Sequence, residues 1–158
     1  MFRKLLTTRS LCLSALIAAL YAALTLLLAP ISYGAIQCRI SEAMTILPIL
    51  LPQSIPGLFI GCVISNLYTG MLTDVIFGSL ATLLAALGTY LLRKKPLLAA
   101  ACPVVANAVI VGLVLSLTNG WPVALTMLEV GAGEMLAVAL GMLVLLPAVK
   151  RIDLAKYL

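Results

Sequence analysis

The sequence predicts an all-α integral membrane protein, a six-helix transmembrane bundle with its N- and C-termini in the cytoplasm. Of its 158 residues, 64% are hydrophobic and only 9% are charged. The mean hydropathy is +1.24, more apolar than a soluble domain needs for its core. The apolar runs consist of Leu, Ala, Val and Ile with few aromatic residues, which favours helical spans over barrel strands. We expect one domain over residues 1–158.

The basic residues predict the orientation in the membrane. Nine of the ten lie in three clusters, at the N-terminus, in a central loop at 93–95 and at the C-terminus. Six spans with a cytoplasmic N-terminus place all three clusters inside, the positive-inside pattern of a bacterial inner (cell) membrane protein. Trp121 then lies at the outer surface. These clusters therefore indicate contact with a lipid bilayer and not with nucleic acid.

The expected spans cover residues 11–29, 42–51, 55–68, 72–92, 97–117 and 122–146. The first follows a basic start, as in a signal peptide, but is too long for one. The segments 42–51 and 55–68 are short and rich in proline. They are two short spans or a re-entrant pair, and both alternatives keep the termini on one side. Pro147 and the basic tail close the last span.

Residues 30–41 form the longest interruption among the apolar runs, and we expect them to form a lid loop over a polar pocket. Pro30 ends the first run, and Gly34 allows a tight turn. Ser41 is expected to cap the following helix, with Glu42 in its first turn. A plain connection between two spans is the alternative.

Polar residues within the spans are the candidates for a binding site, because ionisable groups at membrane depth are costly and usually face an internal cavity. Glu134 lies in the middle of its span with no cation nearby in the sequence. Glu129 precedes it by five residues, so the two cannot share one helix face. The candidates are Arg39, Glu42, Asn66, Asp74, Asn107, Glu129 and Glu134.

Each of these candidates has a structural alternative. Glu42 and Asp74 could be helix-start charges, and Asn66 and Asn107 could be interhelical hydrogen-bonding residues. In the candidate set as a whole, the acidic residues outnumber the one basic residue, Arg39. The set therefore predicts an outward-opening pocket for a ligand that carries positive charge or several N–H donors.

Catalysis is not expected. The chain has no histidine, and its four cysteines are scattered without a CxxC pair, which argues against a metal site and a redox motif. There is no nucleotide-binding loop, so the chain cannot hydrolyse ATP itself, and no cofactor is expected.

Small residues form two rows along the first span. Ala15, Ala19 and Ala23 form one row, and Ala18 and Ala22 lie alongside. Such rows let a second helix approach closely. Spacing alone leaves open whether that helix belongs to this bundle or to a partner.

Six segments carry a resemblance to a known family: APISYG at 29–34, RISEA at 39–43, PGLFIGC at 56–62, NL at 66–67, DVIFGSLATL at 74–83 and GE at 133–134. They resemble the QueT family, substrate-binding (S) components of energy-coupling factor (ECF) transporters for queuosine precursors. It implies a six-helix subunit whose pocket the first loop covers. It also implies three partners, a transmembrane coupling subunit and two cytoplasmic ATPases, with the alanine rows docking on the coupling subunit.

The implied ligand is a 7-deazaguanine base, the 7-aminomethyl precursor or queuine. A carboxylate such as Glu134 or Asp74 suits the N–H edge of guanine, and Glu42 suits the cationic amine. Asn66, Asn107 or Arg39 could donate to the ring carbonyl. The aromatic candidates for stacking on the ring are Tyr33, Tyr68 and Trp121.

Two other functions are compatible with parts of the sequence. A stand-alone, proton-coupled secondary transporter of a small cationic or purine-like solute would use Glu134 as its proton relay. We detect no inverted repeat, which argues against it. A membrane scaffold would leave the buried acids unexplained.

Overall fold

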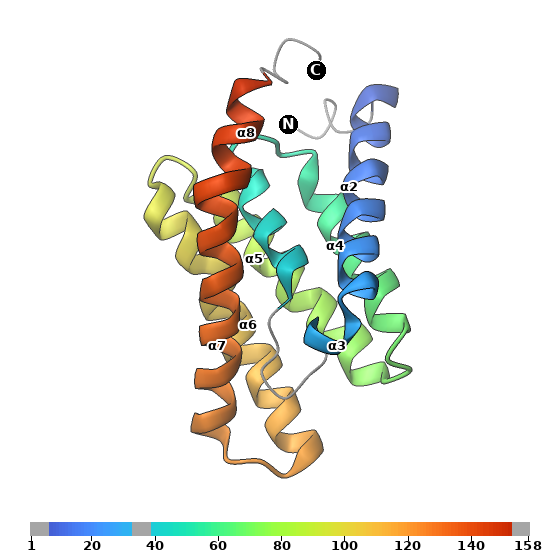
Figure 1. Ribbon diagram of the computed structural model, residues 1–158, viewed down its shortest axis with the longest axis vertical. Coiled ribbons are helices and arrows are strands. Elements are labelled where there is room, and N and C mark those ends of the chain that lie inside the picture. The colour runs from blue at the N-terminus through green and yellow to red at the C-terminus, as the bar shows by residue number, and fades with distance from the viewer. Residues whose placement is uncertain (1–6, 33–38, 153–158) are drawn as a thin grey trace.

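The computed structural model describes residues 7–32 and 39–152, which form a bundle of helices joined by short turns (Figure 1). These residues contain no strand, which confirms the all-α class. The elements are α2 (Thr8–Leu27), α3 (Ala29–Ser32), η1 (Ile40–Ile49), α4 (Ser54–Leu67), η2 (Asp74–Gly78), α5 (Ser79–Leu91), α6 (Pro96–Asn119), α7 (Val123–Leu140), η3 (Gly141–Leu145) and α8 (Leu146–Arg151).

Four helical stretches are long and apolar enough to cross a membrane: Thr8–Leu27, Asp74–Leu91, Pro96–Asn119 and Val123–Arg151. They match the expected first, fourth, fifth and sixth spans. The other two elements, η1 with 10 residues and α4 with 14, are shorter than a perpendicular crossing requires. The membrane class therefore agrees with the sequence, and the count of six spans stays a prediction.

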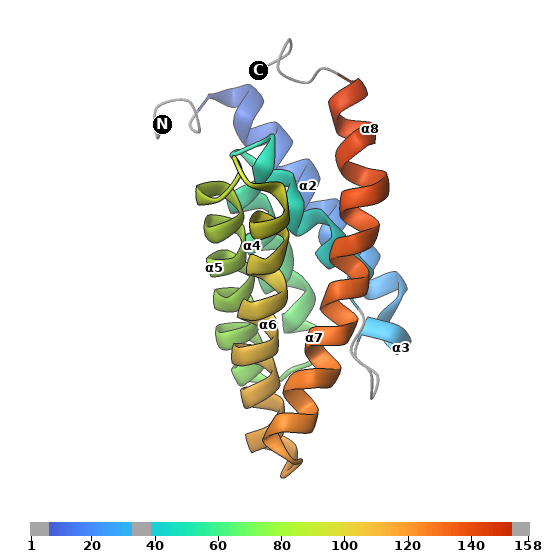
Figure 2. The same cartoon turned by 90° about the vertical axis from the view of Figure 1, so that its left-hand side faces the viewer.

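The path of the chain is that of an up-and-down bundle. Successive elements alternate in direction along the long axis of the bundle (Figures 1 and 2). The helices α2, α4 and α6 point away from the end where α2 begins, and η1, α5 and the continuous stretch from α7 to α8 point back toward it. The α5–α6 turn with Arg93 and the end of α8 with Lys150 lie at the end where α2 starts. Exposed Trp121 lies in the α6–α7 turn at the opposite end. This separation agrees with the expected orientation, which itself stays a prediction.

The lid expectation needs correction at both ends. Pro30 lies inside the short helix α3, near its start, where the missing N–H of proline is tolerated. Arg39, not Ser41, occupies the position before η1. Ser41 lies in the first turn, where its hydroxyl contacts the Thr25 hydroxyl at 2.7 Å instead of capping the helix. Residues 33–38, with Tyr33 and Gly34, lie outside the described residues.

The last span is also longer than expected. Pro147 does not end it, because the helix continues through η3 and α8 to Arg151. The element η3 is a π-helical turn, and Pro147 stands in the first turn of α8 directly after it. A π turn changes the backbone bonding just before the proline, where an uninterrupted α-helix would meet a clash with the ring.

The two small-residue rows of α2 have different surroundings. Ala18 and Ala22 are buried, and α2 crosses α4 closely: a Cβ added at Gly61 would stand 2.8 Å from the Ala18 carbonyl oxygen. Ala15, Ala19 and Ala23 are exposed. The row with Ala18 and Ala22 therefore packs within the bundle, with Ala18 close to Gly61 of α4. The row with Ala15, Ala19 and Ala23 is left open.

The main core lies between α2, η1, α4 and α5. Its buried members include Ile17, Met44, Leu47 and Leu58, and Tyr21 and Cys62 bring polar atoms into the same cluster. These two residues lead directly to the polar site.

Candidate functional site

Glu42 is the centre of a buried polar cluster. Its side chain is 2% exposed. The Tyr21 hydroxyl donates a hydrogen bond to Glu42 Oε1, and Thr82 Oγ1 lies 3.4 Å from the same oxygen. The second oxygen, Oε2, is buried and makes no hydrogen bond within the described part of the chain. Buried carboxylate oxygens are normally paired, so an open one indicates a place for an external donor.

Hydrogen bonds also hold the chain on either side of Glu42. The Thr25 hydroxyl donates to the Tyr21 carbonyl at 2.8 Å, so Ser41 is the donor in the contact between the Thr25 and Ser41 hydroxyls. Thr45 Oγ1 lies 2.5 Å from the Glu42 carbonyl oxygen. Two positions one turn apart on α2 thus hold two consecutive residues of η1.

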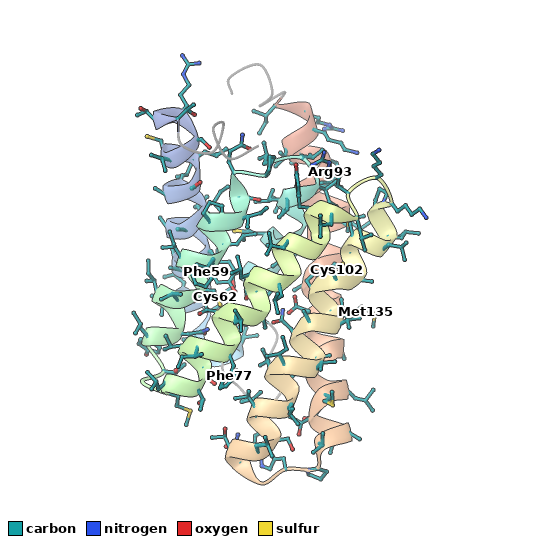
Figure 3. All side chains as sticks on the ribbon, turned by 180° about the vertical axis from the view of Figure 1, so that it is seen from behind. Phe59, Cys62, Phe77, Arg93, Cys102 and Met135 are labelled. Atoms are coloured by element: carbon teal, nitrogen blue, oxygen red, sulfur yellow. The ribbon has the colours of Figure 1, made fainter. Side chains whose placement is uncertain are left out.

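A chain of polar contacts links Glu42 to α4 and α5. Thr82 Oγ1 is 3.3 Å from Cys62 Sγ, which in turn is 3.3 Å from Asn66 Nδ2. Figure 3 shows Cys62 at mid-height in the bundle. Asn66 Nδ2 donates to the Asp74 carbonyl at 2.9 Å, in the first residue of the π-helical turn η2. This bond supports the backbone at the start of η2, while the buried Asn66 Oδ1 makes no hydrogen bond among the described residues.

Glu134 forms the second half of the cluster, from the α7 side. It is 5% exposed and lies close enough to Asn107, Glu42 and Arg39 to interact with them electrostatically. Asn107 lies within reach of a side-chain hydrogen bond to Glu134, but Glu134 Oε1 and Asn107 Nδ2 are both buried without a hydrogen bond of standard geometry among the described residues. A carboxyl oxygen and an amide nitrogen with unused hydrogen-bonding capacity thus lie close together where α6 packs on α7.

Arg39 belongs to this cluster and not to an outer surface. Its side chain is 8% exposed, and its positive charge acts on Glu42 and Glu134. Two carboxyl groups and one guanidinium carry a formal charge of −1 when all are ionised. Because uncompensated charge is costly away from water, the cluster favours a ligand that brings one positive charge.

Other predicted residues lie apart from this cluster. Asp74 has a partly exposed side chain and contributes its backbone carbonyl. Glu129 is also partly exposed and is not among the groups that act on Glu134. Tyr68 and Trp121 are 68% and 46% exposed, so neither provides a buried stacking face here. Tyr33 lies outside the described residues.

Sequence reasoning missed Tyr21, Thr82 and Cys62. A signal for Tyr21 existed: Ser10, Ser14, Tyr21 and Thr25 repeat at intervals of four and seven residues on α2, and all four are buried. Such a polar stripe on an apolar span marks a face turned to the bundle interior. Thr82 and Cys62 gave no comparable signal, because small polar residues are common helix-packing residues in membranes.

The open polar atoms of the cluster suit the binding of a ligand. It presents one free carboxylate acceptor at Glu42 and an acceptor with a neighbouring amide donor at Glu134 and Asn107. An isolated acceptor suits an ammonium group, which only donates. A donor beside an acceptor suits a planar ring edge with a carbonyl next to an N–H.

Comparison with known proteins gives this chemistry a context. The family described as "QueT transporter" matches residues 11–150, which include every residue of the cluster. The queuosine precursor transporter QueT of Lactococcus lactis subsp. cremoris (strain MG1363) is 44% identical over 71 residues, which make up 44% of this chain and 42% of that relative. The match thus spans less than half of the relative, whose name assigns it transport and not catalysis. No solved structure matches the chain. With nearly all of its length matched by the family, the chain belongs to the QueT transporter family.

Proposed function

We propose that this protein is the high-affinity substrate-binding S component of an ECF-type ABC importer for a queuosine precursor. Its ligand is a 7-deazaguanine base, 7-aminomethyl-7-deazaguanine or queuine. The observation that carries the proposal is the pairing of two buried, incompletely bonded carboxyl groups with one unpaired amide donor. Family membership and the name of the relative supply the class of ligand.

The donors and acceptors of the base can be assigned to the cluster. The guanine edge has a carbonyl next to N1–H and the 2-amino group, which complements the Asn107 amide nitrogen next to the Glu134 carboxyl group. The amine on the 7-methylene is cationic and complements Glu42 Oε2. Arg39 offsets one of the two negative charges, and the ligand offsets the other.

The exposed alanine row supports the proposed assembly. Ala15, Ala19 and Ala23 are exposed on α2, whereas Ala18 and Ala22 are buried and Ala18 lies against Gly61 of α4. A flat row of small residues on a membrane helix suits close packing by another helix. We assign the exposed row to the transmembrane coupling subunit, which in turn recruits two cytoplasmic ATPases in a bacterial cell membrane.

Titration of the purified chain with 7-aminomethyl-7-deazaguanine tests the binding function. We expect saturable heat with the aminomethyl base and none with adenine, whose edge presents a donor where guanine presents its carbonyl. Absence of heat with the aminomethyl base and with queuine would reject the proposed ligand class. Identification of a co-purified ligand by mass spectrometry provides an independent measurement.

The stand-alone transporter is the second candidate, because Glu134 is a buried acid with an open oxygen at membrane depth. Vesicles that contain this chain without ATPases separate the two functions. Uptake driven by a pH gradient supports the secondary transporter. Binding without uptake, with uptake restored by the coupling subunit, ATPases and ATP, supports the S component.

The docking assignment has its own test. Ala19→Leu adds bulk to the exposed row and should prevent co-purification with the coupling subunit while ligand binding is retained. Leu16→Ala, at another exposed position of α2, serves as the control. Undiminished co-purification of the Ala19→Leu variant would show that the coupling subunit docks elsewhere.

A further inference from the structure

We infer that Tyr21 is a positioning residue that aims Glu42 at the cationic amine and so sets the preference for ligands that carry it. This inference rests on the proposed function of the site. It adds a residue from α2 that was not among the predicted site residues, and a basis for discrimination between aminated and non-aminated bases. The tyrosine acts through Glu42 and need not touch the ligand itself.

The first support is the contact between the two side chains. Tyr21 is completely buried, and its hydroxyl donates to Glu42 Oε1. A donor on one carboxylate oxygen fixes the rotation of the whole group, so Oε2 keeps a constant direction. Because this orientation exists before the ligand arrives, less side-chain freedom is lost on binding.

The second support is that Thr82 cannot replace Tyr21. The Thr82 hydroxyl has a single proton and three acceptors within reach: the Gly78 carbonyl at 3.2 Å, Cys62 Sγ at 3.3 Å and Glu42 Oε1 at 3.4 Å. The carboxylate is the most distant of the three. Tyr21 is therefore the main donor to Oε1.

The third support is the rigidity of the frame that carries Tyr21. A Cβ added at Gly61 of α4 would stand 2.9 Å from Tyr21 Cβ, so α4 backs this part of α2 without a gap. One turn further along α2, Thr25 is tied to Ser41, the residue next to Glu42. The donor and the acceptor are thus held by connected parts of the backbone.

The chemical consequence concerns ligands that differ only in the amine. With Oε1 occupied by Tyr21, Oε2 remains for one strong, charge-assisted hydrogen bond from an ammonium group. A base with a methyl group in place of the aminomethyl group has no donor for Oε2 and leaves the buried negative charge uncompensated. The preference therefore depends on the direction of Oε2 as well as on its charge.

The test compares two ligands on three proteins. The dissociation constants of 7-aminomethyl-7-deazaguanine and 7-methyl-7-deazaguanine are measured on the wild type, on Tyr21→Phe and on the matched control Tyr90→Phe. Tyr90 lies in α5 near the α5–α6 turn, where its ring stacks on Arg93, and a phenyl ring preserves that stacking. The ratio of two constants from the same sample does not depend on the fraction of folded protein.

We expect Tyr21→Phe to weaken binding of the aminomethyl base by about tenfold or more, the usual effect of losing support for a hydrogen bond to a charged group. The dissociation constant of the methyl base should change by less than about threefold, and Tyr90→Phe should bind both ligands as the wild type does. In Glu42→Gln, adding Tyr21→Phe should have little further effect on the ratio, because both changes remove the same interaction.

Three results would overturn the inference. Unchanged dissociation constants for both ligands in Tyr21→Phe would show that Tyr21 does not position Glu42. Equal weakening of the binding of both ligands, which leaves their ratio unchanged, would show that Tyr21 only supports the fold. Additive effects of Tyr21→Phe and Glu42→Gln would show that Tyr21 acts independently of Glu42. Failure of the wild type to bind either base is a different result, which rejects the proposed ligand class and the inference with it.

Discussion

The two buried carboxyl groups in the polar cluster, Glu42 and Glu134, differ in their hydrogen-bond partners. Glu42 has one oxygen hydrogen-bonded to Tyr21 and a backbone anchored through Ser41 and Thr45. Glu134 has Asn107 as its neighbour, close enough for a side-chain hydrogen bond, but Glu134 Oε1 and Asn107 Nδ2 are both buried without a hydrogen bond of standard geometry among the described residues. Both are buried to a similar extent, so burial does not distinguish them.

The difference indicates different tasks. A carboxylate held on one side presents a single fixed acceptor, which suits one localised positive charge. A carboxyl group beside a free amide presents an acceptor and a donor together, which suits the edge of a planar base. Loss of Glu134 should therefore affect every ligand with that edge, whereas loss of Glu42 should affect only ligands with the amine.

The largest effect is expected from Glu134→Gln. The amide replaces an acceptor with a donor that faces the N–H groups of the base, so binding of the aminomethyl and methyl bases should fall by about 100-fold or more. Glu129→Gln is the matched control on the same helix and should bind both normally. A loss confined to the aminomethyl base would reverse the roles assigned to Glu42 and Glu134.

Glu42→Gln should have a smaller and selective effect. Removal of the charge should weaken the aminomethyl base by about tenfold to 100-fold, because a charge-assisted hydrogen bond is lost. The methyl base should bind nearly as well as before. Isothermal titration of both ligands gives the two constants, and equal losses would mean that Glu42 does not contact the amine.

The two buried amides extend the comparison. Asn66→Leu removes the donor to the Asp74 carbonyl and should lower thermal stability, with a cost of about 1–3 kcal/mol for the unpaired buried group. Asn107→Leu should leave stability nearly unchanged and weaken both bases by about tenfold. Thermal unfolding in detergent, measured beside titration, separates the two effects. The opposite pattern would make Asn66 the ligand-binding amide.

Gly61→Ala should have the smallest effect. The added Cβ stands 2.8 Å from the Ala18 carbonyl oxygen and 2.9 Å from Tyr21 Cβ, so α2 must shift and move the tyrosine from Glu42. Binding of the aminomethyl base should weaken by a few-fold, and binding of the methyl base, which depends on Glu134, should not change. Gly88→Ala, which meets only the Cys102 side chain, is the control for a general packing defect.

The helices were predictable because their signals are local. Runs of Leu, Ala, Val and Ile mark spans without reference to the rest of the fold, so the four long helices lie within a few residues of the expected ranges. One error falls where a proline was expected to end a helix. Pro147 instead lies within a helical segment, directly after the π turn of η3, and such a backbone adjustment leaves no mark in hydropathy.

The site was predictable only as a set of candidates. Glu42, Asn107 and Glu134 were identified because a polar group inside an apolar run is conspicuous by itself. Tyr68 and Trp121 were named by residue type, yet both are exposed, since residue type does not fix which side of a helix faces the interior. Asn66 was open to two interpretations in the sequence, and its contact with the Asp74 carbonyl agrees with a structural role.

By itself, the sequence determined the apolar, membrane-protein class, the long helices and the presence of acids within apolar segments, because hydropathy and charge belong to each segment independently. Only the tertiary structure decided which groups support each carboxyl group. The partners of Glu42 are Tyr21 and Thr82, which lie 21 and 40 residues away along the chain. A hydrogen bond requires two atoms within about 3 Å, and only the packing of α2, η1 and α5 brings these atoms together.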